Sequence, residues 1–189
     1  MSARLFLDSN VLASKTLRDW FFKLSLSGEC SVALASSPLV LAEAVKTFRT
    51  RNPLAPPHAV VALESLIRNT VTDFVTPAER YEQVPGIDSG DLHVHFAALA
   101  AESDALVTLN TKHFSSDTAS YAVVHPDTSL MTIAKAFPLV VLQIASEETA
   151  YWQSRLTELG QVKSVSQALR DAHCPRFASL IEAMNSAFR

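Results

Sequence analysis

The 189-residue sequence predicts an α/β protein, a three-layer α/β/α sandwich with a central parallel sheet, followed by a C-terminal helical extension. Apolar runs of strand length alternate with longer stretches of helical periodicity. The strand-like runs are continuously apolar, which is typical of parallel strands covered on both faces. After Pro138 the pattern turns helical. Residues 1–138 are therefore expected to form the sandwich domain, and residues 139–189 the extension.

In the first quarter of the chain, polar residues and glycine mark where elements end. Asp8 closes a short apolar run, and Gly28 ends the helical pattern that follows it. Ser37 and Pro38 form a helix start, with serine as the N-cap and proline at the first helical position. The elements expected here are a strand at 4–7, a helix at 11–24, a strand at 31–35 and a helix at 38–48.

Proline and aspartate punctuate the next part. Pro53 breaks the pattern, Pro57 begins a helix, and Asp88 is expected to cap another. The elements expected here are helices at 57–68, 89–102 and 128–136, and strands at 72–75, 105–109 and 123–124. In the extension, Gly160 and the pair Cys174-Pro175 divide the pattern into two or three helices.

Composition excludes several classes of protein. The net charge of -3 argues against a general nucleic-acid coat protein, although residues 1–52 carry a local excess of basic side chains. The two cysteines suit reduced thiols in a cytoplasmic protein, and no apolar run approaches the ~18 residues of a membrane span. Four glycines and no matching motif argue against a nucleotide-binding loop or a serine-hydrolase elbow.

Acidic side chains occur where the expected strands end. Asp8 follows the first strand, Thr108 and Asn110 lie at the end of the 105–109 strand, and Asp91 and Glu43 lie near the starts of helices that leave the same edge. Ligands of parallel sheets bind at this edge. Carboxylates gathered there would repel one another, and Mg²⁺ or Mn²⁺ would relieve the repulsion. The pattern predicts metal-assisted phosphodiester hydrolysis.

Each acid also has a purely structural explanation. Asp8 can serve as the N-cap of the first helix, and Asp91 can be an acid favoured in a first helical turn. Glu43 can lie on a solvated face and pair with Lys46. Spacing alone leaves both explanations open.

The ordered set of four segments resembles a PIN-domain ribonuclease, and most closely the VapC-like toxins of bacterial type II toxin–antitoxin systems. The resemblance covers roughly residues 3–137. The segments are DSNVL at 8–12, LAEAV at 41–45, GDLHV at 90–94 and LVTLNTKHF at 106–114.

This resemblance implies a Mg²⁺- or Mn²⁺-dependent endoribonuclease that cuts RNA such as tRNA or rRNA. Asp8, Glu43 and Asp91 would be the metal-binding acids, and Thr108 would orient a water or a ligand carboxylate. Asn110 stands where the family often has a fourth acid, and His113 stands where some members place that acid instead. The resemblance is therefore also compatible with a homologue that has only weak ribonuclease activity.

Basic residues near Glu43 are candidates for RNA contact, because phosphates need cationic partners. The candidates are Lys46, Arg49, Arg51 and Lys112. A basic helix C-terminus favoured by the helix dipole is the alternative for the first three. The family resemblance also implies a cognate antitoxin protein as partner. The helical stripes of the extension either pack on the sandwich or contact the antitoxin or a second copy in a homodimer.

Two other functions stay open from the sequence. The first is a catalytically weak RNA- or partner-binding module on the same fold. The second is a phosphatase that uses Asp8 as nucleophile, although Asn10 stands where that class has a second aspartate.

Overall fold

The computed structural model describes residues 3–77, 82–114, 119–159 and 163–187, without the side chains of 155–159 and 187. The described chain contains a five-stranded sheet in the order β3-β2-β1-β4-β5, and each neighbouring pair is parallel. This confirms the predicted α/β fold. The strands are β1 (Ala3–Leu7), β2 (Val32–Ser36), β3 (Asp73–Phe74), β4 (Ala105–Val107) and β5 (Ala122–Val124).

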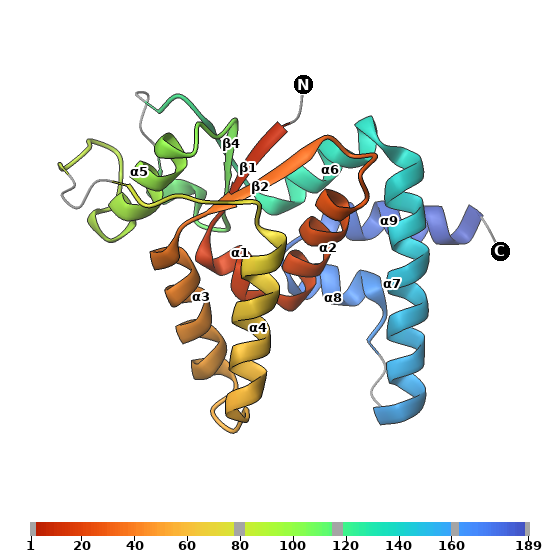
Figure 1. Cartoon of the computed structure of the whole chain (residues 1–189). Coiled ribbons are helices and arrows are strands. Elements are labelled where there is room, and N and C mark those ends of the chain that lie inside the picture. The colour runs from red at the N-terminus through yellow and green to blue at the C-terminus, as the bar shows by residue number, and fades with distance from the viewer. Residues whose placement is uncertain (1–2, 78–81, 115–118, 160–162, 188–189) are drawn as a thin grey trace.

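Helices flank the sheet, as a three-layer sandwich requires (Figure 1). The crossovers through α1–α2 and α3–α4 run in one direction along the sheet, and the crossover through α5 returns in the other. Because crossovers between parallel strands are almost always right-handed, this order is expected to put α1–α4 on one face and α5 on the opposite face. The helices are α1 (Ser9–Ala13), α2 (Lys15–Leu26), α3 (Pro38–Arg51), α4 (Pro57–Thr70), α5 (Leu92–Ala100), α6 (Pro126–Ala136), α7 (Pro138–Leu159), α8 (Val165–Asp171) and α9 (Pro175–Ala187), with 3₁₀ turns η1 (Ser89–Asp91) and η2 (Thr111–His113).

The strand order reverses direction at β1, which pairs with β2 on one side and β4 on the other. In this register Leu5 lies opposite Leu34 of β2 and Ala105 of β4. From β1 the chain crosses over to β2, and from β4 it crosses over to β5, so the connections leave these two neighbouring strands in opposite directions. In open parallel sheets this switch point is where ligands bind.

Two predicted helices are shorter than expected because polar residues interrupt them. The stretch after β1 is broken at Ser14, which has extended backbone angles and accepts a hydrogen bond from the Leu17 amide at the start of α2. The helix predicted at 89–102 begins instead as η1, whose first turn is capped by the Asp88 side chain through the Gly90 amide. α5 follows from Leu92.

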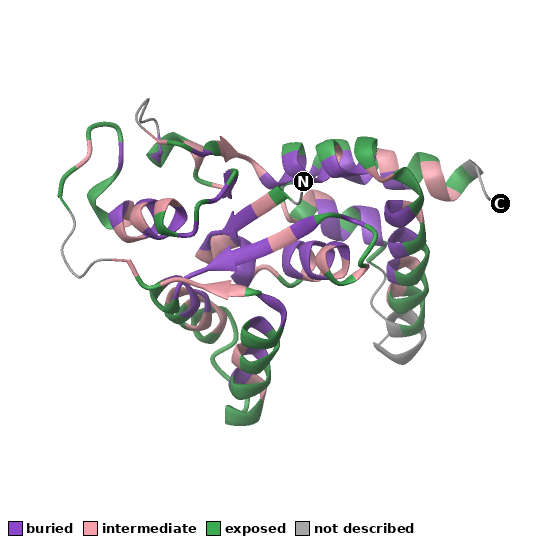
Figure 2. Ribbon diagram, turned by 45° about the horizontal axis from the view of Figure 1, so that its top comes forward, coloured by how far each residue is buried: buried purple, intermediate pink, exposed green. Residues whose placement is uncertain are grey.

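The helical extension packs into the same hydrophobic core as the sandwich. Trp20 of α2 and Phe177 of α9 are both fully buried and meet edge to face, with ring centroids 4.8 Å apart. Trp20, Phe21 and Phe22 therefore belong to the core. Figure 2 shows the central strands buried and the outer faces of the helices exposed.

A buried aspartate joins α6 to α9. Asp127, in the first turn of α6, accepts hydrogen bonds from the backbone amides of Arg176 (3.3 Å) and Phe177 (2.9 Å) at the start of α9. These amides lack partners within their own helix, so Asp127 satisfies them and fixes where α9 begins.

Both cysteines, Cys30 and Cys174, are buried free thiols, in keeping with the reduced state expected from the sequence. Burial raises the pKa of the Cys174 thiol to about 12. No single helix in the described ranges has both the length and the apolar character needed to cross a membrane. α6 taken together with 138–154 has that length and composition, but the chain bends by 119° between them.

Candidate functional site

Asp8 lies directly beyond the carboxyl end of β1 and is only 3% exposed. It acts as the N-cap of α1, and its Oδ1 accepts a 2.6 Å hydrogen bond from the Ser9 amide. The capping role considered from the sequence is therefore real. It does not account for the burial of the carboxylate, because a cap on an exposed helix end needs none.

Asn10 and Thr108 hold the other oxygen of Asp8. The Thr108 hydroxyl donates to Asp8 Oδ2 over 2.6 Å, and Asn10 Nδ2 donates to the same oxygen over 2.6 Å. Asn10 Nδ2 also donates to Thr108 Oγ1 over 3.0 Å. The Leu109 amide donates to Asn10 Oδ1 over 3.1 Å, which fixes the orientation of the amide group. The three side chains form a closed network across β1 and β4.

The hydroxyl of Thr108 has no bonding capacity left for a substrate or water. It donates its one hydrogen to Asp8 and accepts from Asn10 Nδ2 and, over 3.0 Å, from the Asn110 amide. A hydroxyl offers one donor and two lone pairs, so all three are in use. Of the two roles expected for Thr108, orienting a ligand carboxylate matches this geometry and orienting a water does not.

Burial is the largest influence on the ionisation of Asp8. It raises the pKa of the carboxyl group above its ordinary value, while the hydrogen bonds from Thr108 and Ser9 lower it. The negative charge of Asp91 also raises the pKa of Asp8, by less than burial or the hydrogen bond from Thr108 changes it. A cation between them would relieve both effects.

Glu43 of α3 faces His93 of α5 across this edge. Glu43 Oε1 and His93 Nε2 lie 3.3 Å apart, close enough for an ion pair, although among the described residues Nε2 finds no acceptor in hydrogen-bond alignment. His93 is the main cause of the lowered pKa of Glu43, and Glu43 is the main cause of the raised pKa of His93. The 3.3 Å separation suits an ion pair when the imidazole is protonated.

Asp91 meets a second histidine. His113 Nδ1 lies 2.7 Å from Asp91 Oδ2, and Asp88 joins them, so that one ligand atom of each residue lies within 4.8 Å of the others. Backbone pairing builds this group: Asp88 N donates to His113 O over 3.0 Å, beside the antiparallel bridge between Ile87 and Phe114. The group lies at the sheet edge where the sequence predicted acids.

The remaining predicted site residue, Asn110, contributes through its backbone. Its amide donates to Thr108 Oγ1, and its side chain is exposed. Lys112, in η2, is also exposed, next to His113. The five acidic and polar candidates thus lie around the carboxyl ends of β1, β2 and β4. Thr108 bonds directly to Asp8, the Asn110 amide bonds to Thr108, and Asp91 pairs with His113.

A groove of about 350 Å³ runs along α3 from Ser9. Besides Ser9, it is lined by residues one and two helical turns apart on α3, namely Glu43, Lys46, Thr47, Thr50 and Arg51. Two of the four predicted RNA-contacting cations therefore border the groove that begins at Glu43. Arg49 is exposed on the same helix but is not part of the lining.

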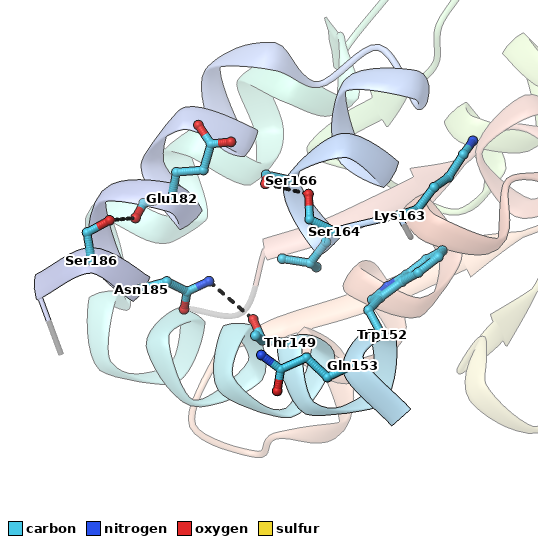
Figure 3. A pocket seen from close by; sticks show the side chains of 10 residues that line it. Thr149, Trp152, Gln153, Lys163, Ser164, Ser166, Glu182, Asn185 and Ser186 are labelled. Carbon is cyan, nitrogen blue, oxygen red and sulfur yellow. Dashed lines mark hydrogen bonds between the residues drawn. The ribbon is translucent and has the colours of Figure 1, made fainter. Parts of the chain in front are cut away.

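Other hollows exist among the helices of the extension, but their chemistry is different. One of about 300 Å³ lies between α7, α9 and the start of α8 (Figure 3). Its polar groups bond to one another: Asn185 to Thr149 over 3.1 Å, and Ser164 to Ser166 over 3.1 Å. The acidic sheet edge is the stronger candidate, because it combines the buried Asp8 with several further acidic side chains.

Sequence reasoning missed the part played by Asn10 and His93. The sequence signal for Asn10 was its position two residues after Asp8, on the first turn of the helix that leaves β1. The contact with Thr108 depends on β1 pairing with β4, which no local pattern reveals.

No protein-family model matches the chain, and neither a curated protein nor a solved structure shows significant similarity to it. The function therefore has to be inferred from the geometry of the site and from the motif resemblance.

Proposed function

We propose that this protein is a Mg²⁺- or Mn²⁺-dependent endoribonuclease of the PIN type that hydrolyses phosphodiester bonds of RNA such as tRNA or rRNA. The observation that carries the proposal is the Asp8 carboxylate. It is buried at the switch point of a parallel sheet, held by Thr108 of a neighbouring strand, and coupled to the charge of Asp91. Buried carboxylates coupled in this way favour a bound cation.

By its chemistry the donor set suits a hard divalent cation. Among the described residues, however, the ligand atoms that already lie within 4.8 Å of one another are those of Asp88, Asp91 and His113, without Asp8 or Glu43. Asp8, Glu43 and Asp91 offer carboxylate oxygens at one sheet edge, and these are the ligands that Mg²⁺ and Mn²⁺ prefer. Asp8 would hold the ion most directly, with Glu43 and Asp91 beside it. When bound, such an ion supplies an activated water and stabilises charge on a phosphoryl group.

The groove along α3 supports a nucleic-acid substrate. Lys46 and Arg51 border it together with Glu43, so a phosphate lying in the groove would meet cations within two helical turns of the acids. The hydroxyls of Thr47 and Thr50 are further phosphate-binding groups along the same face. The chain would thereby orient the scissile bond beside Asp8.

The test is cleavage of labelled total tRNA and rRNA by the purified protein in Mg²⁺, Mn²⁺ or EDTA, beside an Asp8→Ala variant. We expect metal-dependent cuts that leave 5′-phosphate and 3′-hydroxyl ends and that vanish in the variant. Asp171→Ala is the matched control, because this aspartate is exposed and paired with Lys163 far along the chain. Cleavage that survives in Asp8→Ala would reject the site.

The role as a toxin with a cognate antitoxin, acting in the cytoplasm, is part of the same proposal and follows from the motif resemblance. Co-expression with the protein encoded by a neighbouring gene tests it. Growth arrest on expression of this chain, relieved by that partner and absent for Asp8→Ala, is the expected result.

A second function is favoured by one feature of the site. Glu43 and Asp91 already have histidine partners, at 3.3 Å and 2.7 Å, and Asn110 replaces a charge. An acid engaged by a histidine is less available to a cation. This arrangement suits a module that binds RNA without cutting it. Retained RNA binding without turnover at saturating Mn²⁺ would favour this second function.

A further inference from the structure

The two oxygens of Asp8 differ in how fully backbone and side-chain hydrogen bonds engage them. A carboxylate offers about four lone-pair positions, two on each oxygen. On Oδ2 both are taken, by Asn10 Nδ2 and by the Thr108 hydroxyl. On Oδ1 one is taken by the Ser9 amide. A cation can therefore approach Asp8 through Oδ1 alone unless a hydrogen bond of the network breaks.

We propose that Asn10 is a positioning residue that determines ion specificity: by occupying Oδ2 it makes Asp8 a one-oxygen ligand, and the site thereby selects Mg²⁺ or Mn²⁺ over Ca²⁺. The inference rests on the proposed metal-dependent function and deepens it. Ca²⁺ takes six to eight oxygens and often binds both oxygens of one carboxylate, whereas Mg²⁺ needs a compact octahedron of single contacts.

The hydrogen bonds among Asp8, Asn10 and Thr108 are hard to rearrange, because every hydrogen of the Asn10 amide group and of the Thr108 hydroxyl is already in use. Asn10 Nδ2 uses its two hydrogens on Asp8 and Thr108, and Oδ1 accepts from the Leu109 amide. Asp8 and Thr108 are both buried, at 3% and 0% exposure. A larger ion that needed Oδ2 would have to break a hydrogen bond to a buried charged group with no water to replace it.

Asn10, rather than Thr108, is the member whose loss changes selectivity most cleanly. Removing the Thr108 hydroxyl would also deprive the Asn110 amide of its acceptor and disturb the chain at the end of β4. Removing the Asn10 side chain frees one lone pair on Oδ2 and leaves the Thr108 bond to keep Asp8 in place.

The test is calorimetric titration of Mn²⁺ and of Ca²⁺ into the wild-type protein and into Asn10→Ala, without RNA. Asp8→Ala supplies the background from other acidic groups. We expect the wild-type ratio of the Ca²⁺ to the Mn²⁺ dissociation constant to fall by about tenfold in Asn10→Ala. A loss of structure alone would weaken both ions together and leave the ratio unchanged.

The matched control is Asn185→Ala, which removes a second asparagine–threonine hydrogen bond, that to Thr149, in the extension. It should keep the wild-type ratio. An unchanged ratio in Asn10→Ala, or an equal fall in Asn185→Ala, would overturn the proposal. If Asn10→Ala does not fold, Thr108→Val should lower the ratio and Thr108→Ser restore it, and an unchanged ratio in Thr108→Val would overturn it equally.

These outcomes are separate from those of the cleavage assay. If the preference for Mn²⁺ over Ca²⁺ falls in Asn10→Ala but the wild-type protein does not cut RNA, the proposed nuclease activity is contradicted and the role of Asn10 in ion specificity is supported. A protein that cuts RNA with Ca²⁺ as readily as with Mn²⁺ contradicts the specificity role and supports the nuclease.

Discussion

Thr108, at the end of β4, donates its hydroxyl hydrogen to Asp8, at the end of β1, across 2.6 Å and across one hundred residues of sequence. The bond joins the two strands between which the sheet reverses its order. It also fixes the carboxylate that we propose as the main cation ligand.

Replacing Thr108 with valine should impair RNA cleavage more than folding. Valine keeps the shape but lacks the hydrogen that orients Asp8, and loss of a group that orients a metal ligand typically costs about 10- to 100-fold in metal affinity or activity. Steady-state cleavage and Mn²⁺ titration measure the effect. Thr108→Ser, which retains the hydroxyl, should stay near wild type, and equal losses in both variants would contradict the orienting role.

The Glu43–His93 pair should give stability a distinct pH dependence. The lowered pKa of Glu43 adds stability above its ordinary value of 4.5, and this is lost as the pH falls through the lowered pKa. The raised pKa of His93 adds stability below its ordinary value of 6.5, and this is lost as the pH rises through the raised pKa. The contribution is therefore greatest between these two ordinary values.

A double-mutant cycle with Glu43→Gln and His93→Gln measures the pair in urea at pH 5.5 and pH 9. Because Glu43 is nearly half exposed, we expect a coupling free energy of only about 0.5 kcal/mol at the lower pH, and less at the higher. A coupling that is larger at pH 9 would show that the pair is not ionic.

Two basic side chains of α3, Lys46 and Arg51, line the groove, and a third, Arg49, lies outside its lining. Lys46→Ala and Arg51→Ala should each weaken RNA binding. Each should also reduce, by about one, the slope of the logarithm of the binding constant against the logarithm of the salt concentration. Arg49→Ala, on the same helix but outside the groove lining, should have a smaller effect. Binding isotherms at several salt concentrations decide this, and equal losses for all three would mean that the groove does not define the contact.

Phe177→Ala should destabilise the sandwich as well as the extension, because Phe177 packs edge to face on Trp20 in the shared core. Deleting a buried phenylalanine side chain costs about 3–5 kcal/mol. Urea unfolding followed by Trp fluorescence and by far-ultraviolet circular dichroism should shift together in one transition. Separate transitions would instead support two independent units divided near residue 138.

The strands were predicted to within about two residues because each is a short apolar run bounded by polar residues, a pattern that depends only on neighbours in sequence. The same is true of Asp8, whose place after β1 follows from the end of the run. The break at Ser14 was missed because the apolar periodicity continues across it, and one serine outweighs the pattern by capping α2.

The sequence predicted the residues of the candidate site more readily than the contacts between them. Asp8 and Asp91 could be named from strand ends, but the partnerships of Glu43 with His93 and of Asp91 with His113 join segments that only the tertiary fold brings together. The role of Asn10 is of the same kind, because its amide reaches the end of a strand that the sequence places a hundred residues later.

The pairing of β1 with β4 affects how quickly the candidate site forms during folding. Leu5 lies opposite Ala105, so the chain must close a loop of about a hundred residues before these strands meet. Parallel sheets with such non-local pairing fold slowly, in the range of about milliseconds to seconds. Asp8 acquires its Thr108 partner only in that late step. Recovery of RNA cleavage during refolding should therefore lag behind the appearance of helix, since a chain without this pairing has no assembled centre.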